Sequence, residues 1–173
     1  MAYRPTPILS IQTGSIDMNG VTTNTATITA VVVANSILYL TGQSTGSAGT
    51  NVQGLARITL TNTTTVTATS MAALGTATPV TFTVVEYRPR YIKSIQRGTI
   101  DVNGGTTAMA TITSVDTTKS FVVPLGWTLN SAIAMALVQL PDLRLTNATT
   151  VTARVGADPG VAQLVGYEVV EFY

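Results

Sequence analysis

The sequence contains the same pattern twice. Residues 11–31 align with residues 95–115 without a gap, and 14 of the 21 positions are identical. Two shorter blocks repeat at nearly the same offset, one with 8 identities in 11 positions: 58–68 with 143–153, and 82–87 with 167–172. A repeat of this kind indicates a structural unit used more than once. We therefore predict a tandem duplication, with an N-terminal arm (1–6), module 1 (7–87), a linker (88–90) and module 2 (91–173).

The residue types within the repeats favour β-structure. Thr supplies 33 of the 173 residues, and β-branched side chains suit a pleated sheet. Residues 25–30 alternate Thr with Ala or Ile, as expected where one face of a sheet is solvated. The turn signals place six strands in module 1: 9–16, 22–33, 37–40, 55–61, 65–70 and 79–87. We predict an all-β protein of two tandem duplicated, small antiparallel β-sandwich or jelly-roll-like domains.

Each module carries an Asn-Gly pair between two alternating runs, Asn19-Gly20 and Asn103-Gly104. Asn-Gly is the strongest short signal for a type I′ hairpin, because both central residues need positive φ. The preceding aspartates, Asp17 and Asp101, also permit reading each copy as half of a calcium loop. Calcium needs six to eight oxygen ligands, and neither copy has a second acidic residue nearby. We predict turns and no metal site.

Two further features indicate local backbone structure. Gly14 lies between Ile11 and Ile16, which have opposite parity, and Gly98 holds the same place in module 2. A glycine-marked β-bulge that reverses the exposed face explains this spacing. Asn62 and Asn147 begin Asn-x-Thr patterns that fit glycosylation acceptors or hairpin tips, and we predict hairpin tips.

The chain offers little for catalysis. It has neither His nor Cys and only eight acidic residues, whereas acid–base catalysis needs a group with a tunable pKa. A glycosidase-like pair of carboxylates could form across the two modules, for example Glu86 with Glu171. They occupy equivalent repeat positions, so a repeated strand-end role is the simpler interpretation. We predict no enzymatic activity, no catalytic residue and no cofactor.

Basic and aromatic residues supply the candidate contacts to a partner. Four of the nine basic residues lie in residues 87–97, which serve either as a solvated linker or as a contact to an acidic neighbour. Trp127, the single Trp, lies in a segment that diverges between the copies and serves either as core or as an interface anchor. The N-terminal arm adds one arginine. The predicted partner-contact residues are Arg4, Arg88, Arg90, Tyr91, Lys93, Arg97 and Trp127.

Charge and hydropathy limit the partners and the location. The net charge of +1 lacks the clustered basic face that a nucleic acid requires. No apolar run reaches the roughly 18 residues that a bilayer span needs. The opening residues contain no apolar core of a secretory signal. We expect synthesis in the cytoplasm and no nucleic-acid or membrane partner.

The module resembles a known group of proteins. Module 2 reads "SIQRGTI", "TATITSVDTTKSFV", "LTNATTVTARV" and "YEVVEF", which is similar to a short module of uncharacterised structural proteins of tailed bacteriophages. Module 1 keeps most of this pattern but has "NSILYL" where the "KSFV" stretch is expected. The resemblance implies a virion component in the head or the tail: a capsid-decorating, head-fibre or tail-associated subunit.

Physical reasoning adds an expectation about assembly. An 84-residue β module is marginal alone, and weakly charged faces and open strand edges favour association. We predict a homo-oligomer, a trimer, that also contacts other virion proteins such as capsid or tail subunits. The alternative is a carbohydrate-binding or receptor-binding adhesin module, for which Trp127, Tyr39 and Tyr91 are candidate stacking residues.

Overall fold

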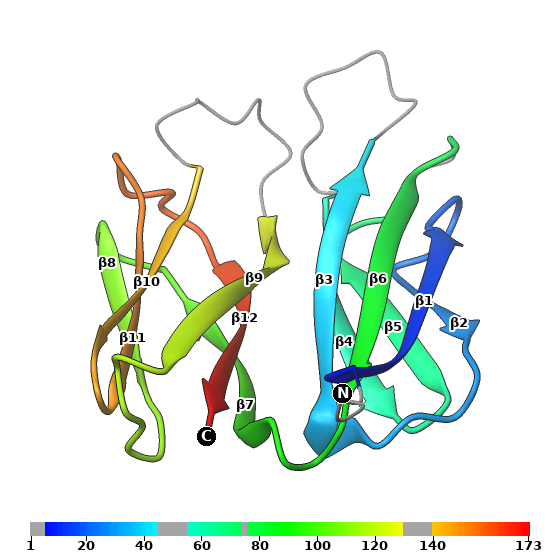
Figure 1. The fold of residues 1–173 in the computed structure, drawn as a ribbon. Helices are drawn as coiled ribbons and strands as arrows, with labels where there is room; N and C mark the ends of the chain where they lie inside the picture. The colour runs from blue at the N-terminus through cyan, green and yellow to red at the C-terminus, as the bar shows by residue number, and fades with distance from the viewer. Residues whose placement is uncertain (1–5, 45–54, 74–75, 130–139) are drawn as a thin grey trace, which may run out of the picture.

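The computed structural model describes residues 6–44, 55–73, 76–129 and 140–173, and these form strands with one short 3-10 turn (Figure 1). The prediction of an all-β, antiparallel fold is confirmed. Among the described residues, no helix has the length and apolar character that crossing a membrane requires. Arg4 and the segment 45–54 lie outside the described residues, as do positions 130–139 of the divergent segment that contains Trp127.

The strands form antiparallel sheets that pack in pairs. The bounds are β1 (Ile8–Asp17), β2 (Thr23–Thr27), η1 (Val33–Asn35), β3 (Ser36–Gln43), β4 (Ala56–Asn62), β5 (Thr65–Ser70), β6 (Pro79–Tyr87), β7 (Ile92–Asp101), β8 (Thr107–Thr111), β9 (Ser120–Leu129), β10 (Asp142–Asn147), β11 (Thr150–Arg154) and β12 (Gln163–Phe172). In the first half, β1–β6–β3 lies over β2–β5–β4. In the second half, β7–β12–β9 lies over β8–β11–β10, and a single bridge between β4 and β9 joins two of these sheets into six strands (Figure 1).

The strand order is therefore the same in both halves, and each half is a β-sandwich. The hydrogen bonds outside the sheets also recur, since the N–H of Ile28 reaches Thr64 O and the N–H of Ile112 reaches Thr149 O. The origin of this similarity by duplication, and the domain boundaries drawn from the sequence, stay predictions.

One predicted strand is much shorter than expected. The strand predicted at 22–33 ends at Thr27, and the alternation fails beyond Ile28, because Ala30 is exposed and Val31 is buried. Here the chain crosses from one sheet to the other. In this crossing segment, the backbone N–H groups of Ile28 and Val31 donate to carbonyls of the hairpin tip at Thr64 and Thr63. The side-chain amide of Gln12 accepts the N–H of Thr29 at 2.7 Å and donates to the carbonyl of Thr29 at 3.0 Å. Gln96 and Thr113 repeat this arrangement.

The predicted hairpins at Asn19-Gly20 and Asn103-Gly104 are wrong. The strands before and after each pair belong to different sheets, so each turn joins the two layers of a sandwich. Positive φ is confined to the glycines, at 71° for Gly20 and 74° for Gly104. A turn that needs positive φ only at its third residue suits this connection, as in type II.

The hairpin tips predicted at Asn62 and Asn147 are confirmed, since each side chain accepts the N–H two residues ahead, at 2.8 Å.

The predicted bulges at Gly14 and Gly98 are also wrong. Both glycines lie in unbroken register, Gly14 opposite Phe82 and Gly98 opposite Tyr167. A Cβ would come within 2.5 Å of the ring of Phe82 or of the hydroxyl of Tyr167. The glycines are therefore required because a ring lies across the strand. Ile11 has opposite parity to Ile16 because it faces outward.

The core has two clusters, and one of them crosses the boundary between the halves. The second cluster contains only residues of the second half. The first contains the core of the first half together with four residues of the second: Ile92, Val123, Leu125 and Val170. The two sandwiches are thus packed against each other.

Candidate functional site

At the junction, the β3 side of the first half meets the outer face of the β7–β12–β9 sheet of the second half (Figure 1). Arg97 on β7 and Glu168 on β12 are directly opposite in the ladder. Arg97 Nε lies 2.7 Å from Glu168 Oε2, and the Glu168 side chain is fully buried. Both residues then reach the first half. Arg97 donates to the carbonyl of Ser36 at 2.6 Å, and Glu168 Oε1 accepts the N–H of Leu38 at 3.2 Å.

This ion pair covers the free edge of β3. An edge strand presents unpaired N–H and C=O groups that can recruit another strand. Arg97 donates to one backbone carbonyl of this edge, and Glu168 accepts one of its N–H groups. Arg97 also donates to the carbonyl of Val33 at 3.3 Å. The pair therefore fixes the two halves in one register and closes an edge.

Burial raises the pKa of Glu168 to about 7, against the opposing effects of the Arg97 charge, the Leu38 N–H and the Arg97 hydrogen bond. Removing a carboxylate from water disfavours its charged form, whereas a cation and N–H donors favour it. Desolvation is the largest effect at Glu168.

Gly126 allows the backbones of the halves to approach. Gly126 pairs with Arg57 of β4 and has φ of 87°. A Cβ at Gly126 would lie 2.4 Å from the carbonyl oxygen of Ala56, whereas one at Gly166 would make an ordinary contact with the Cβ of Arg57 at 3.5 Å. The absence of a side chain at Gly126 leaves room for β4 to approach β9.

Three residues at the junction differ from their counterparts in the first half. At the repeat positions of Arg97, Glu168 and Gly166, the first half has Thr13, Thr83 and Thr81. Thr13 and Thr83 are opposite each other, as Arg97 and Glu168 are. Sequence reasoning missed Glu168. The signal that could have identified it was the matched replacement of two threonines by two opposite charges.

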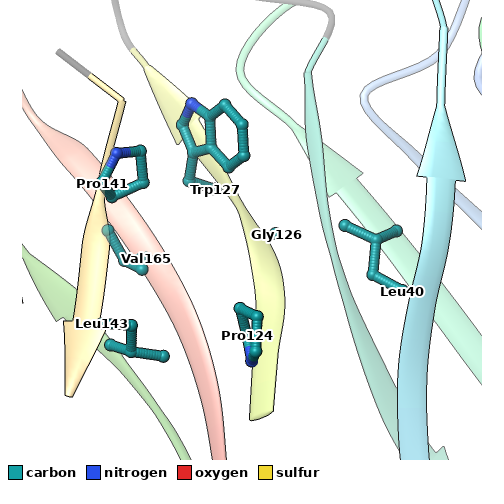
Figure 2. A pocket seen from close by; sticks show the side chains of 7 residues that line it. All are labelled: Leu40, Pro124, Gly126, Trp127, Pro141, Leu143 and Val165. Atoms are coloured by element: carbon teal, nitrogen blue, oxygen red, sulfur yellow. The ribbon is translucent and has the colours of Figure 1, made fainter. Parts of the chain in front are cut away.

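A pocket of about 240 Å³ lies beside the junction, where Leu40 of the first half faces β9 and β10 of the second (Figure 2). Its lining is Leu40, Pro124, Gly126, Trp127, Pro141, Leu143 and Val165. Trp127 is half-buried and packs against the second core cluster. Its indole Nε1 is buried and has no hydrogen-bond partner among the described residues. Trp127 thus contributes to the core and also to an open apolar surface.

The other predicted contact residues do not form a single site with Trp127. Arg88 donates to the carbonyl of Thr6 at 2.9 Å, and the Arg90 guanidinium lies 5.1 Å from the ring centre of Tyr91. Lys93 pairs with Glu171 at 2.8 Å. These residues lie around the connection from β6 to β7, whereas Trp127 lies near the C-terminal end of β9. Their contact to a partner stays a prediction.

Glu86 and Glu171 each hold the chain where it crosses between sheets. Glu86 accepts the N–H of Val32 at 2.9 Å, and Glu171 accepts the N–H of Asp116 at 2.8 Å. That N–H is the first reason that the pKa of Glu171 lies below its ordinary value, and Lys93 is the second. Each carboxylate also accepts a serine hydroxyl, from Ser10 at 3.1 Å and from Ser94 at 3.2 Å. The described residues contain no cluster of three or more potential metal ligands.

Comparison with known proteins identifies no relative: no protein family, no curated protein and no solved structure matches this chain.

Proposed function

We propose that this chain is a structural subunit of a tailed-bacteriophage virion and that it acts through protein–protein contacts. The proposal rests on the structural role of the buried carboxylates. Glu168 and Glu171 are both buried, and both accept backbone N–H groups and pair with cations of the same chain. Groups that are bound in this way hold a fold together and are not presented to a substrate. The resemblance of the repeated module to phage structural proteins supplies the class of particle.

The proposed subunit is a homo-oligomer, a trimer, that also contacts capsid or tail proteins. Only 10% of its residues are charged, and Leu9 and Ile11 expose 47% and 60% of their surface. Exposed apolar groups on sheet faces are typical of surfaces that meet another protein. Light scattering after size-exclusion chromatography tests the assembly. We expect a mass three times that of the 18.0 kDa chain, and a monomer at micromolar concentration would contradict the proposal.

Immunogold electron microscopy of purified particles tests the place of the subunit in the virion. Antibody to this chain should label either the head or the tail of each particle. Antibody to an unrelated host protein is the control. Particles that carry no label, although the chain is present in the infected cell, would exclude a virion role.

One observation favours carbohydrate binding as a second candidate, namely the half-buried ring of Trp127 beside an open pocket. Sugar sites usually combine such a ring with acidic, amide or basic groups. The described residues that line this pocket supply none of them, so we rank this function second. A glycan array decides the matter. Saturable binding that is lost in Trp127→Ala and kept in Tyr91→Ala would favour it over the structural role.

A further inference from the structure

The outer face of the β1–β6–β3 sheet corresponds to the face that is covered at the junction. In the second half, Ile95 is opposite Val170, and Ile95 packs against the first core cluster. In the first half, Ile11 is opposite Val85 in the same register. Ile11 is nevertheless 60% exposed, and Leu9 beside it is 47% exposed. The same kind of face is therefore covered in one half and open along β1 in the other.

The element that covers this face at the junction also has a counterpart. β3 covers it, and β9 is the equivalent strand, with Leu38 opposite Val84 and Val122 opposite Val169. Because residues alternate in the direction of their N–H groups along an antiparallel strand, the N–H of Val122 points away from β12, as that of Leu38 points away from β6. Among the described residues, no side chain bonds to it. Phe121 next to it is 37% exposed, whereas its counterpart Ile37 is fully buried at the junction.

We propose that the β9 edge of one copy, over residues 120–122 and thus before its bridge to β4 at Gly126, docks on the Leu9–Ile11 face of a second copy, so that the chains associate head to tail. This inference rests on the proposed homo-oligomer and names its surfaces. The two surfaces are different, and contacts between different surfaces build closed rings when the rotation permits. A ring of three copies is the trimer of the proposed function.

The side chains at this contact are suited to a weaker association than the internal junction. Leu9 and Ile11 offer apolar area to Phe121. The hydroxyls of Thr13 and Thr83 stand where Arg97 and Glu168 stand in the second half, and they can donate to a carbonyl and accept an N–H of the β9 edge. Neutral hydrogen bonds of this kind are weaker than charge-assisted ones.

A second difference also loosens the contact between copies. Thr81 occupies the position of Gly166, and its hydroxyl donates to the carbonyl of Gly42 at 3.1 Å. Thr81 therefore adds a side chain to this face at a position where the second half has none. The contact between copies is therefore held by Ile11 and by edge hydrogen bonds.

The first test is Ile11→Arg, with Met109→Arg as the matched control. Both side chains are exposed on strands and carry no described contact that folding requires, so both variants should keep the wild-type circular dichroism spectrum. We expect Ile11→Arg to raise the dissociation constant of the oligomer by about tenfold or more, measured by analytical ultracentrifugation. Met109→Arg should leave it unchanged. An oligomer equally stable in Ile11→Arg would overturn the inference.

The second test adds the missing charges. The double variant Thr13→Arg, Thr83→Glu supplies to the first half the pair that caps an edge in the second, and we expect it to tighten the association by about tenfold. Thr25 and Thr67 are also directly opposite each other, so Thr25→Arg, Thr67→Glu is the control and should have no effect. Equal effects of the two double variants, or no effect of either, would contradict the β9 edge as the occupant.

The two proposals fail in different ways. A wild-type chain that is monomeric at every concentration contradicts the proposed homo-oligomer itself. If the wild-type chain is an oligomer and Ile11→Arg does not change its dissociation constant, only the surface named here is contradicted. That result would indicate that another face joins the copies.

Discussion

Arg97 and Glu168 face each other across β7 and β12, and both extend beyond their own sheet to bind the backbone of β3 in the other half of the molecule. Their threonine counterparts, Thr13 and Thr83, are opposite each other in the same register but belong to a face that remains partly open. Two substitutions at one ladder position thus distinguish a covered sheet face from an exposed one.

Breaking this pair from one side should be costly. In Arg97→Met, the Glu168 carboxylate stays buried without its cation, and removal of one partner of a buried pair typically costs about 3–5 kcal/mol. Urea denaturation at pH 8 measures the free energy of unfolding. The exposed pair Arg144–Asp142 supplies the control, since Arg144→Met should leave stability unchanged. Equal stability of Arg97→Met and wild type would show that the pair does not hold the halves together.

Replacing both members should cost less than replacing one. The variant Arg97→Thr, Glu168→Thr copies the first half and leaves no buried charge, although it uncaps the edge of β3. We expect it to be more stable than Arg97→Met, because leaving a charge unpaired costs more than losing a pair. A double-mutant cycle gives the coupling between the two residues. A coupling near zero would mean that each side chain acts independently.

Glu168 should make stability fall as the pH rises. Its pKa is raised by burial to about 7 from an ordinary value of 4.5. Between these values the folded state binds more protons than the unfolded state. The contribution of Glu168 to the free energy of unfolding is therefore fully present below pH 4.5 and is lost as the pH rises to about 7. The difference amounts to about 3 kcal/mol. Unfolding measurements should show that the free energy of unfolding falls from pH 4.5 to 7 in the wild type but not in Glu168→Gln. Parallel curves over this range would disprove the prediction.

Glu171 should act in the opposite direction and at lower pH. The Asp116 N–H and then Lys93 lower its pKa below the ordinary value, so its contribution is present above about pH 4.5 and is lost as the pH falls through the folded value. Thermal unfolding between pH 2.5 and 6 should show that acid narrows the gap in Tm between wild type and Glu171→Gln. A gap that is constant with pH would rule out this role.

Gly126 should tolerate alanine far less well than Gly20. Both have positive φ, so the backbone strain of an alanine is comparable. At Gly126 a Cβ meets the carbonyl of Ala56 at 2.4 Å, whereas nothing lies within 4 Å of a Cβ at Gly20. We expect Gly20→Ala to cost about 1 kcal/mol and Gly126→Ala to cost clearly more, because the halves must separate. Chemical denaturation compares them, and similar losses would mean that the close approach of β4 is dispensable.

The sequence by itself determined the all-β class and most strand positions, including 65–70 and 79–87, because alternation and β-branched side chains are local properties of a strand. It also indicated the hairpin tips at Asn62 and Asn147, where the side chain bonds to its own turn. Only the tertiary structure decided that Asn19-Gly20 joins two sheets and that Gly14 makes room for the ring of Phe82. It alone placed Arg97 and Glu168 on the edge of β3. Each of these depends on groups that are distant along the chain, and neither periodicity nor turn chemistry within one segment specifies which distant groups will meet.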